Sequence, residues 1–197
     1  MNGRTRWLLC GALLLTAVIL SGAALLTEQR TMAEKLIRLH VVANSDSEAD
    51  QAVKLQVRDA VLTAAEGMDE AELRENLPRL REAARDCLRQ NGVSHPVAVS
   101  LQWETFPTRN YETFSLPAGR YEVLRVTIGA GEGHNWWCVV FPSICFRAAA
   151  ELEEAAVSAG FTDEEIRLIT EDGKTYQLKF KLLELLARFG WFSGGNQ

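Results

Sequence analysis

The run Trp136–Phe141 constrains the fold more than any other stretch of this sequence. It is apolar at every position, lies between Gly133 and Pro142, and begins with two adjacent tryptophans. An unbroken apolar run between turn residues is typical of a strand that is buried on both faces. We therefore expect this strand at the centre of the core.

Glycines 129, 131 and 133 precede this strand. A phosphate-binding loop would need a helix after the glycines, because the helix N–H groups hold the anion. Here a strand is expected on each side of the glycines. We therefore interpret the loop as the turn of a β-hairpin.

Two of the four cysteines, Cys138 and Cys145, flank Phe141-Pro142. If the chain reverses there, the two thiols face each other, and a disulfide would stabilise the fold by about 2–3 kcal/mol. Two buried free thiols are the alternative. A tight turn with Pro142 as its second central residue would need a cis bond. Cys87 falls on the apolar face of a predicted helix, so we expect a buried thiol there.

The N-terminus predicts export. Arg4 and Arg6 precede an uncharged stretch, Trp7–Leu26, in which small residues follow the most apolar part. This pattern is typical of a signal peptide, residues 1–24, cleaved after Ala23 or Ala24. The stretch is also long enough to span a bilayer as an uncleaved anchor to about residue 26. In that case residues 7–26 would be the membrane contact, and in both cases the remainder lies outside the cytoplasmic membrane.

The rest of the chain alternates between helical and strand patterns. Ile37, Leu39 and Val41 share one face of a strand, and Arg38 and His40 share the other, which we expect to lean toward solvent. Further predicted elements are helices at 48–66, 69–90 and 148–159, strands at 97–103 and 121–128, a hairpin at 166–180 and a terminal helix from 182.

Short local signals refine these predictions. Either Ser45 with Glu48 or Ser47 with Asp50 would form a capping box before the helix at 48–66, and Thr162 with Glu165 would form another. Pro78 predicts either a kink in the helix at 69–90 or a helix start near Asn76. Residues 28–34 are expected to be a linker or an extra helical turn after the signal.

This order predicts an α+β fold, with a mainly antiparallel sheet and helices packed on one of its faces. The predicted organisation is a signal or anchor segment, a core domain at 27–147, and a C-terminal helical and hairpin extension at 148–197 that packs on the core. Residues after Gly190 include Trp191-Phe192, which would fold back on the core or form a contact surface.

Composition and motifs argue against an enzyme. The net charge is −5, with no basic cluster that would suit a nucleic acid. A Cys–His nucleophile could be assembled from Cys138 with His40 or His134, but a thiolate needs a partly exposed, electropositive site. No metal-ligand spacing is present, and no cofactor is predicted. An exported Cys/His-dependent hydrolase of the cell envelope is the alternative function.

Four segments resemble the stage II sporulation protein R family in sequence, order and spacing: Ile37–Ser47, Phe106–Arg109, Leu116–Glu122 and Gly133–Pro142. The similarity covers residues 35–147. The resemblance implies a protein that is made in the forespore and exported into the space between forespore and mother cell. There it would activate a membrane-embedded aspartic protease, which cleaves the precursor of sigma factor E, and it would have no active site of its own.

The polar and aromatic groups of these segments that packing does not require are the candidate contacts with the protease. Asn44 and Asp46 could instead cap a helix, and His134 could shape a loop. Trp136 and Trp137 point to opposite faces of their strand, so at least one is core and the other could anchor a partner. The candidates are His40, Asn44, Asp46, Arg109, Tyr111, His134, Asn135, Trp136 and Trp137.

Overall fold

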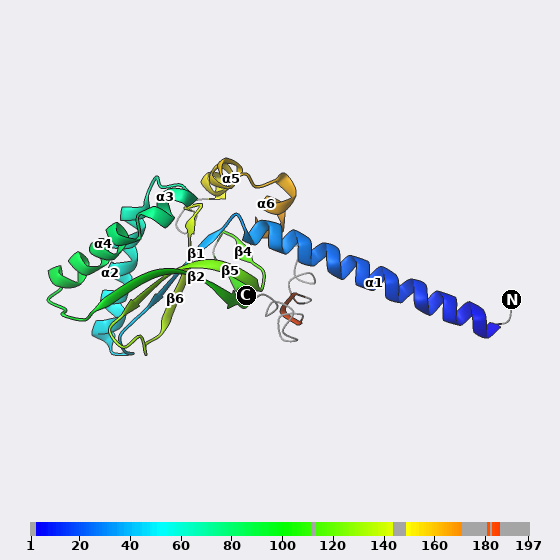
Figure 1. The fold of residues 1–197 in the computed structure, drawn as a ribbon, viewed down its shortest axis with the longest axis horizontal. Helices are drawn as coiled ribbons and strands as arrows, with labels where there is room; N and C mark the ends of the chain where they lie inside the picture. The colour runs from blue at the N-terminus through cyan, green and yellow to red at the C-terminus, as the bar shows by residue number, and fades with distance from the viewer. Residues whose placement is uncertain (1–2, 112, 144–148, 171–180, 182, 186–197) are drawn as a thin grey trace.

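The computed structural model describes residues 3–111, 113–143, 149–170, 181 and 183–185. A long helix leads into a sheet domain with helices around it (Figure 1). The elements in chain order are α1 (Gly3–Ala33), β1 (Ile37–Val42), α2 (Glu48–Ala65), α3 (Glu70–Glu75), α4 (Leu77–Gln90), β2 (Val97–Phe106), β3 (Arg109–Asn110), β4 (Ser115–Leu116), β5 (Gly119–Ile128), β6 (Asn135–Phe141), α5 (Ala149–Ser158) and α6 (Asp163–Thr170).

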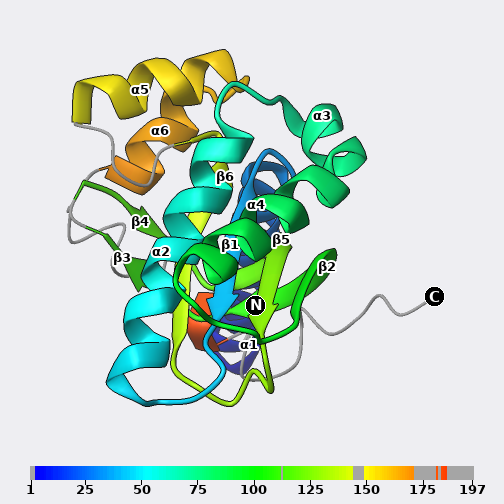
Figure 2. The ribbon, with the colours of Figure 1, turned by 90° about the vertical axis from the view of Figure 1, so that its left-hand side faces the viewer.

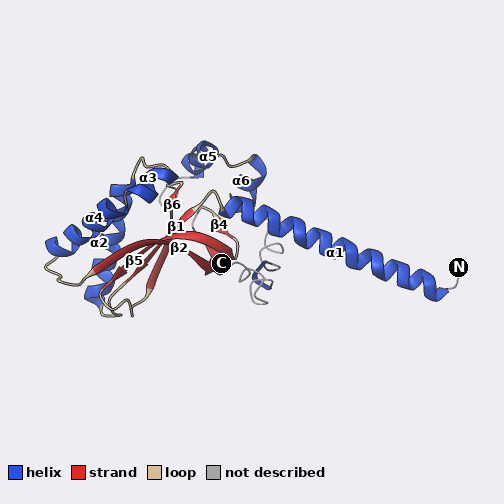
Figure 3. Cartoon of the chain, in the orientation of Figure 1, coloured by secondary structure: helices blue, strands red, loops and turns tan. Residues whose placement is uncertain are grey.

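The main sheet has four strands in the order β2-β5-β1-β6. β5 pairs with β2 and β6 pairs with β1 in antiparallel fashion, whereas β1 and β5 are parallel. A separate two-stranded ribbon joins β3 and β4. The predicted α+β class with a mainly antiparallel sheet is confirmed (Figure 3).

The predicted place of the apolar run was wrong. Residues 135–141 form β6, which ends the strand order, and the centre of the sheet is β1 with β5. The hairpin between β5 and β6 was also wrong, because β1 lies between them. The loop crosses the end of β1: the backbone N–H groups of Glu132 and Gly133 donate to the carbonyls of Asn44 and Ala43 at 3.2 and 3.0 Å.

Helices α2 and α4 cover one face of the sheet (Figure 2). Their apolar residues recur at helical spacing and meet the alternate residues of β1, β5 and β6. Ser47 is the N-cap of α2, with its side chain accepting from the N–H of Asp50. Pro78 lies in the first turn of α4 after a break at Asn76, as one of the two sequence-based alternatives predicted. Members of this core include Leu39, Val41, Val57, Val61, Leu80, Ala84, Leu88, Leu124, Val126 and Cys138.

A second core lies on the opposite face, around Tyr121 and Val123 of β5. The last turns of α1, the β3–β4 ribbon, α5 and α6 contribute to it. We expected Arg38 and His40 to lean toward solvent on this face, and that was wrong: they are 0% and 6% exposed. Alternation of polarity shows which residues share a face of a strand, but another layer can still cover that face.

Helix α1 is continuous from the apolar N-terminal segment into this core. Among the described residues one helix, spanning Thr5–Ala33, is long and apolar enough to cross a membrane, as a signal or anchor would be. Trp7 and Leu8 are largely exposed, whereas Leu25, Gln29 and Met32 are buried. Residues 28–34, which the sequence suggested as a linker or extra helical turn, contain the last turns of α1.

The C-terminal region is helical as far as the structure describes it. Thr162 and Glu165 form the predicted capping box: the N–H of Thr162 donates to Glu165 Oε2 at 2.7 Å and that of Glu165 to Thr162 Oγ1 at 3.3 Å. The helix that follows, α6, includes Ile166–Thr170, which we predicted as a strand; that was wrong, because the cap starts a helix. Residues 171–180 and 186–197, with the rest of the hairpin and Trp191-Phe192, lie outside the described residues, as does the predicted boundary at 147/148.

Candidate functional site

The structure divides the predicted contact residues among three places. Asn44, Asp46, His134 and Asn135 meet where the β1–α2 and β5–β6 connections touch, at one end of the sheet. His40, Arg109, Tyr111 and Trp137 lie on the second face of the sheet, beside β1. Trp136 stands alone on the face that α2 and α4 cover, with the Arg58 guanidinium 4.5 Å from its ring centre.

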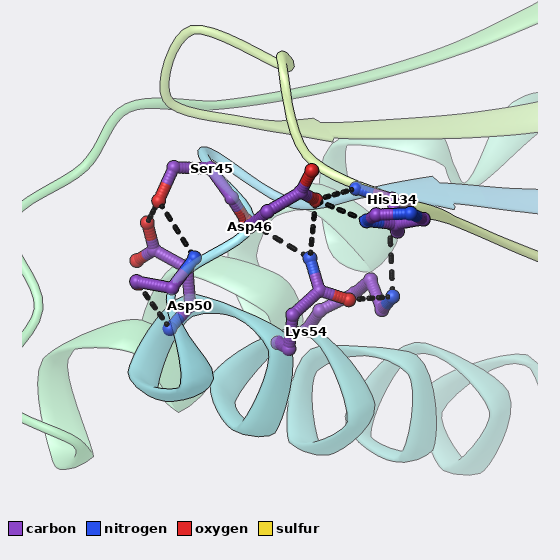
Figure 4. Close-up of polar contacts among 7 residues, drawn as sticks. Ser45, Asp46, Asp50, Lys54 and His134 are labelled. Carbon is purple, nitrogen blue, oxygen red and sulfur yellow. Dashed lines mark hydrogen bonds and ion pairs between the residues drawn. The ribbon is translucent and has the colours of Figure 1, made fainter.

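The contact between the two connections is built around Asp46 and His134 (Figure 4). Asp46 Oδ1 accepts hydrogen bonds from the backbone N–H of His134 at 2.6 Å and from its side chain at Nδ1. These bonds hold the pKa of Asp46 below its usual value. Both side chains are exposed, at 54% for Asp46 and 78% for His134. We call this contact, with Asn44, Ser45, Asp50, Gln51, Lys54 and the adjacent Asn135, the loop junction.

A buried lysine of α2 stabilises the junction through hydrogen bonds. Lys54 is 5% exposed and donates to Gln51 Oε1 at 2.5 Å and to the His134 carbonyl at 3.0 Å. Burial lowers the pKa of Lys54. Gln51 in turn donates to the Ser45 carbonyl at 2.9 Å. Sequence reasoning missed this lysine, although its spacing from Val57 and Val61 places it on the buried stripe of α2.

Asn44 and Asp50 fix the shape of the β1–α2 connection. Asn44 donates to Asp50 Oδ2 at 2.9 Å and accepts from the N–H of Ala130 at 3.0 Å. Ser45 also donates to Asp50 Oδ2, at 2.6 Å, and the two bonds lower the pKa of Asp50. The Asp50 carboxylate therefore stays within the connection and does not complete the predicted capping box with Ser47.

Glycine is required where the two connections touch. A Cβ on Gly133 would lie 2.2 Å from the Ser45 carbonyl oxygen, and one on Gly129 would lie 2.1 Å from Asn44 Oδ1. Gly129 also has a φ of 58°, which L-residues rarely adopt. The glycines thus permit close backbone approach and do not form a phosphate cradle.

On the second sheet face, aromatic rings and cations alternate. The Arg109 guanidinium lies 3.6 Å from the ring centre of Trp137. His40 Nδ1 lies 2.9 Å from Glu104 Oε2, and its ring centre lies 5.8 Å from that of Trp137. Tyr111 accepts from Arg38 Nη2 at 2.8 Å. His40 is buried, so of these residues only the half-buried Arg109, Tyr111 and Trp137 present surface to a partner.

Cys87 and Cys138, the cysteines of the folded domain that the structure describes, are both buried. Cys138 is 3% exposed, pairs with Leu39 in the sheet and is not a free thiol. Burial of this kind opposes formation of a reactive thiolate. Cys145 lies outside the described residues, so the Cys138–Cys145 pairing stays a prediction. The Phe141–Pro142 bond is cis, as a tight turn there required. Cys87 is a buried free thiol, as predicted, and burial raises its pKa.

Among the side chains that the structure describes, no group of three or more His, Cys, Asp or Glu could hold a metal ion. A groove of about 460 Å³ opens between the α2–α3 connection, the end of β6 and α5. Met68, Phe141, Pro142, Glu154 and Ala159 are among its lining residues, and the predicted contact residues are not.

Comparisons with known proteins identify the family of this chain. The family model described as stage II sporulation protein R matches residues 33–151, from the last residue of α1 into α5. Stage II sporulation protein R of Bacillus subtilis (strain 168) is 34% identical over 152 residues, which are 70% of this chain and 68% of that protein. No solved structure matches. The chain belongs to the stage II sporulation protein R family.

Proposed function

We propose that this chain is an exported signal of endospore formation, which leaves the forespore and acts on a membrane-embedded aspartic protease of the mother cell. The protease then cleaves the precursor of sigma factor E. Family membership supports this function. The apolar helix α1 supports export, since a signal that acts on another cell must first leave its own.

The observation that carries the proposal is that the family match coincides with the folded domain and includes the loop junction. Two of the segments that resemble the family, Ile37–Ser47 and Gly133–Pro142, are far apart in sequence and meet at Asp46 and His134. Hydrogen bonds from Lys54 and Gln51 to the backbone carbonyls of His134 and Ser45 tie the two connections to α2. A preorganised polar surface loses little conformational freedom when it binds a partner.

The exposed groups of the junction are the proposed contacts with the protease. Asp46, His134 and Asn135 are exposed, whereas Asn44 and Asp50 are occupied by bonds within the connection. Arg109, Tyr111 and Trp137 would form a second patch. Binding activates the protease only if the domain has a higher affinity for the active state than for the inactive state.

The test uses vesicles that carry the membrane protease and the sigma precursor. Purified residues 25–197 are applied to the extracytoplasmic side, and precursor cleavage is followed over time. We expect cleavage only when the domain is added. A folded domain that produces none, with and without residues 1–24 attached, would refute activation by this chain.

Matched variants locate the contact surface. His134→Ala removes an exposed side chain of the junction, and we expect at least about a tenfold higher domain concentration for half-maximal cleavage, a loss typical of one interface residue. Arg89→Ala removes an exposed side chain from the last turn of α4 and should leave cleavage unchanged. Equal activity of the two variants would place the contact elsewhere.

A further inference from the structure

Arg38 is a buried cation that has no counterion among the residues that the structure describes. It is 0% exposed, and its guanidinium stacks 4.0 Å from the ring centre of Phe106 and 5.0 Å from that of Tyr121. Nη2 donates to the Tyr111 hydroxyl, but Nε and Nη1 are buried without any hydrogen-bond partner. Burying an unpaired charge costs folding free energy, and arginine cannot reduce this cost by deprotonation because its guanidinium group stays charged.

A second cation lies beside the first. Arg109, from the β3–β4 ribbon, stacks on Trp137, and its Nε is also buried without a partner. Burial lowers the pKa of Arg109, and the positive charge of Arg38 lowers it further. Both arginines also lie close to Tyr111, which follows β3 directly. Arg38 stacks on Phe106 and Arg109 stacks on Trp137, and the centres of these two rings are 6.2 Å apart. Two strands that are distant in sequence thus place two incompletely hydrogen-bonded guanidinium groups on neighbouring rings.

The acids of the neighbouring strands are engaged elsewhere. Glu104 of β2 accepts from Arg125 at 3.0 Å and from Gln102 at 2.6 Å, and it also pairs with His40. Glu122 of β5 lies on the other face, where Arg74 of α3 binds both of its carboxylate oxygens at 2.5 Å. Within the described part of the chain, neither Arg38 nor Arg109 has a carboxylate at ion-pair distance.

We propose that Arg38 and Arg109 form a binding site for one phosphate-type oxyanion, with the Tyr111 hydroxyl as a further polar contact. Guanidinium groups bind phosphate oxygens through several parallel N–H bonds, and such charge-assisted bonds are the strong ones. A phosphate near charge −2 balances both cations, whereas one carboxylate leaves a positive charge unpaired. Phe106 and Tyr121 keep the Arg38 guanidinium away from solvent, which strengthens its attraction for an anion. This site does not depend on the proposed signalling function.

The test measures the melting temperature of the full chain in non-ionic micelles against inorganic phosphate, with ionic strength held constant by sodium chloride. A ligand that binds only the folded state raises the melting temperature, by about 5–10 °C at a hundredfold excess over its Kd. A second arm replaces inorganic phosphate with a short-chain phosphatidic acid, which distinguishes a lipid headgroup from the free ion. A rise in either arm, without one in acetate at equal ionic strength, supports the site.

Three variants assign the response to the arginines. Arg109→Met should weaken the apparent affinity at least about tenfold, since one of the two charge-assisted contacts is lost. Arg38→Met should abolish the response and melt no lower than the anion-free wild type, because an uncompensated buried charge is gone. Arg125→Met removes a cation of the same face that is already paired with Glu104, and should respond as wild type does.

The proposal is wrong if neither phosphate source raises the melting temperature. It is also wrong if acetate raises it as much, or if Arg109→Met responds with wild-type affinity. Should Arg38→Met fail to fold, the comparison of Arg109→Met with Arg125→Met still decides the question.

Discussion

Replacing Met32 by alanine tests whether the end of α1 belongs to the folded domain. Met32 is 0% exposed and packs in the core that includes Leu36, Phe106 and Tyr121. Truncating a buried methionine to alanine costs about 2–5 kcal/mol, because apolar contacts are lost and a cavity remains. A loss of about 3 kcal/mol is a large part of the about 5–15 kcal/mol by which such domains are stable.

The assay is equilibrium unfolding of residues 25–197 in urea, followed by tryptophan fluorescence. With a slope of about 2 kcal/mol per molar urea, the expected loss lowers the midpoint by about 1.5 M. Val157→Ala is the control, because Val157 is an exposed position on α5, and its midpoint should change by less than about 0.3 M. A chain that begins at residue 34 should be less stable than either variant.

An unchanged midpoint for Met32→Ala would refute this reasoning. It would mean that α1 does not contribute to the core in solution and that the domain begins after residue 33. The expected loss would instead mean that the last turns of α1 belong to the domain, and the predicted cleavage after Ala23 or Ala24 would leave these turns in place.

Three further changes have defined outcomes. Gly133→Ala places a methyl group 2.2 Å from the Ser45 carbonyl oxygen and should cost about 1–3 kcal/mol in thermal unfolding and reduce precursor cleavage. Its control, Gly67→Ala, meets open space at a φ of 78°, so it should cost about 1–2 kcal/mol through backbone strain alone and leave cleavage intact. Tyr121→Phe leaves the Pro117 carbonyl without its 2.7 Å partner and should cost about 1–3 kcal/mol in urea. Burial alone would raise the pKa of Glu165, but hydrogen bonds from neighbouring groups outweigh burial and hold that pKa below its usual 4.5. The ionised carboxylate therefore stabilises the fold fully above pH 4.5, and this stabilisation is lost as the pH falls through the folded-state pKa. Glu165→Gln removes the titrating group, so the melting temperature of this variant should depend less on pH between pH 6 and pH 2.

Local patterns in the sequence predicted most of the elements correctly. The Ser47 cap, the break before Pro78 and the Thr162–Glu165 capping box all depend on residues close in sequence, and each is present. The α+β class follows from the order of these elements. Strand order could not be predicted in this way, because the apolar character of β6 fits an edge strand under other layers as well as a central one.

The sequence predicted some residues of the candidate site but not their contacts, because those contacts join segments that are distant in the sequence. The family resemblance identified Asp46 and His134, but it could not show that they touch, since 88 positions separate them. Lys54 was missed because a lysine on a helix is normally assigned to a solvated face. Arg38 was placed in solvent because the β3–β4 ribbon and the C-terminal helices, which cover its face, are distant in the sequence.

The unbroken course of α1 determines how far the domain can reach. At about 1.5 Å per residue, the part of the helix before Leu25 is about 33 Å long, close to the about 30 Å thickness of a bilayer's hydrocarbon layer. If the helix is left uncut, it joins the domain directly to the membrane-spanning segment, with no flexible linker between them. The domain then stays against its own membrane and acts only across a gap about as wide as itself. If the helix is cut, the same domain diffuses, and its range is set by concentration. One peptide bond near Ala24 therefore separates a domain that is confined to its own membrane from one that diffuses freely.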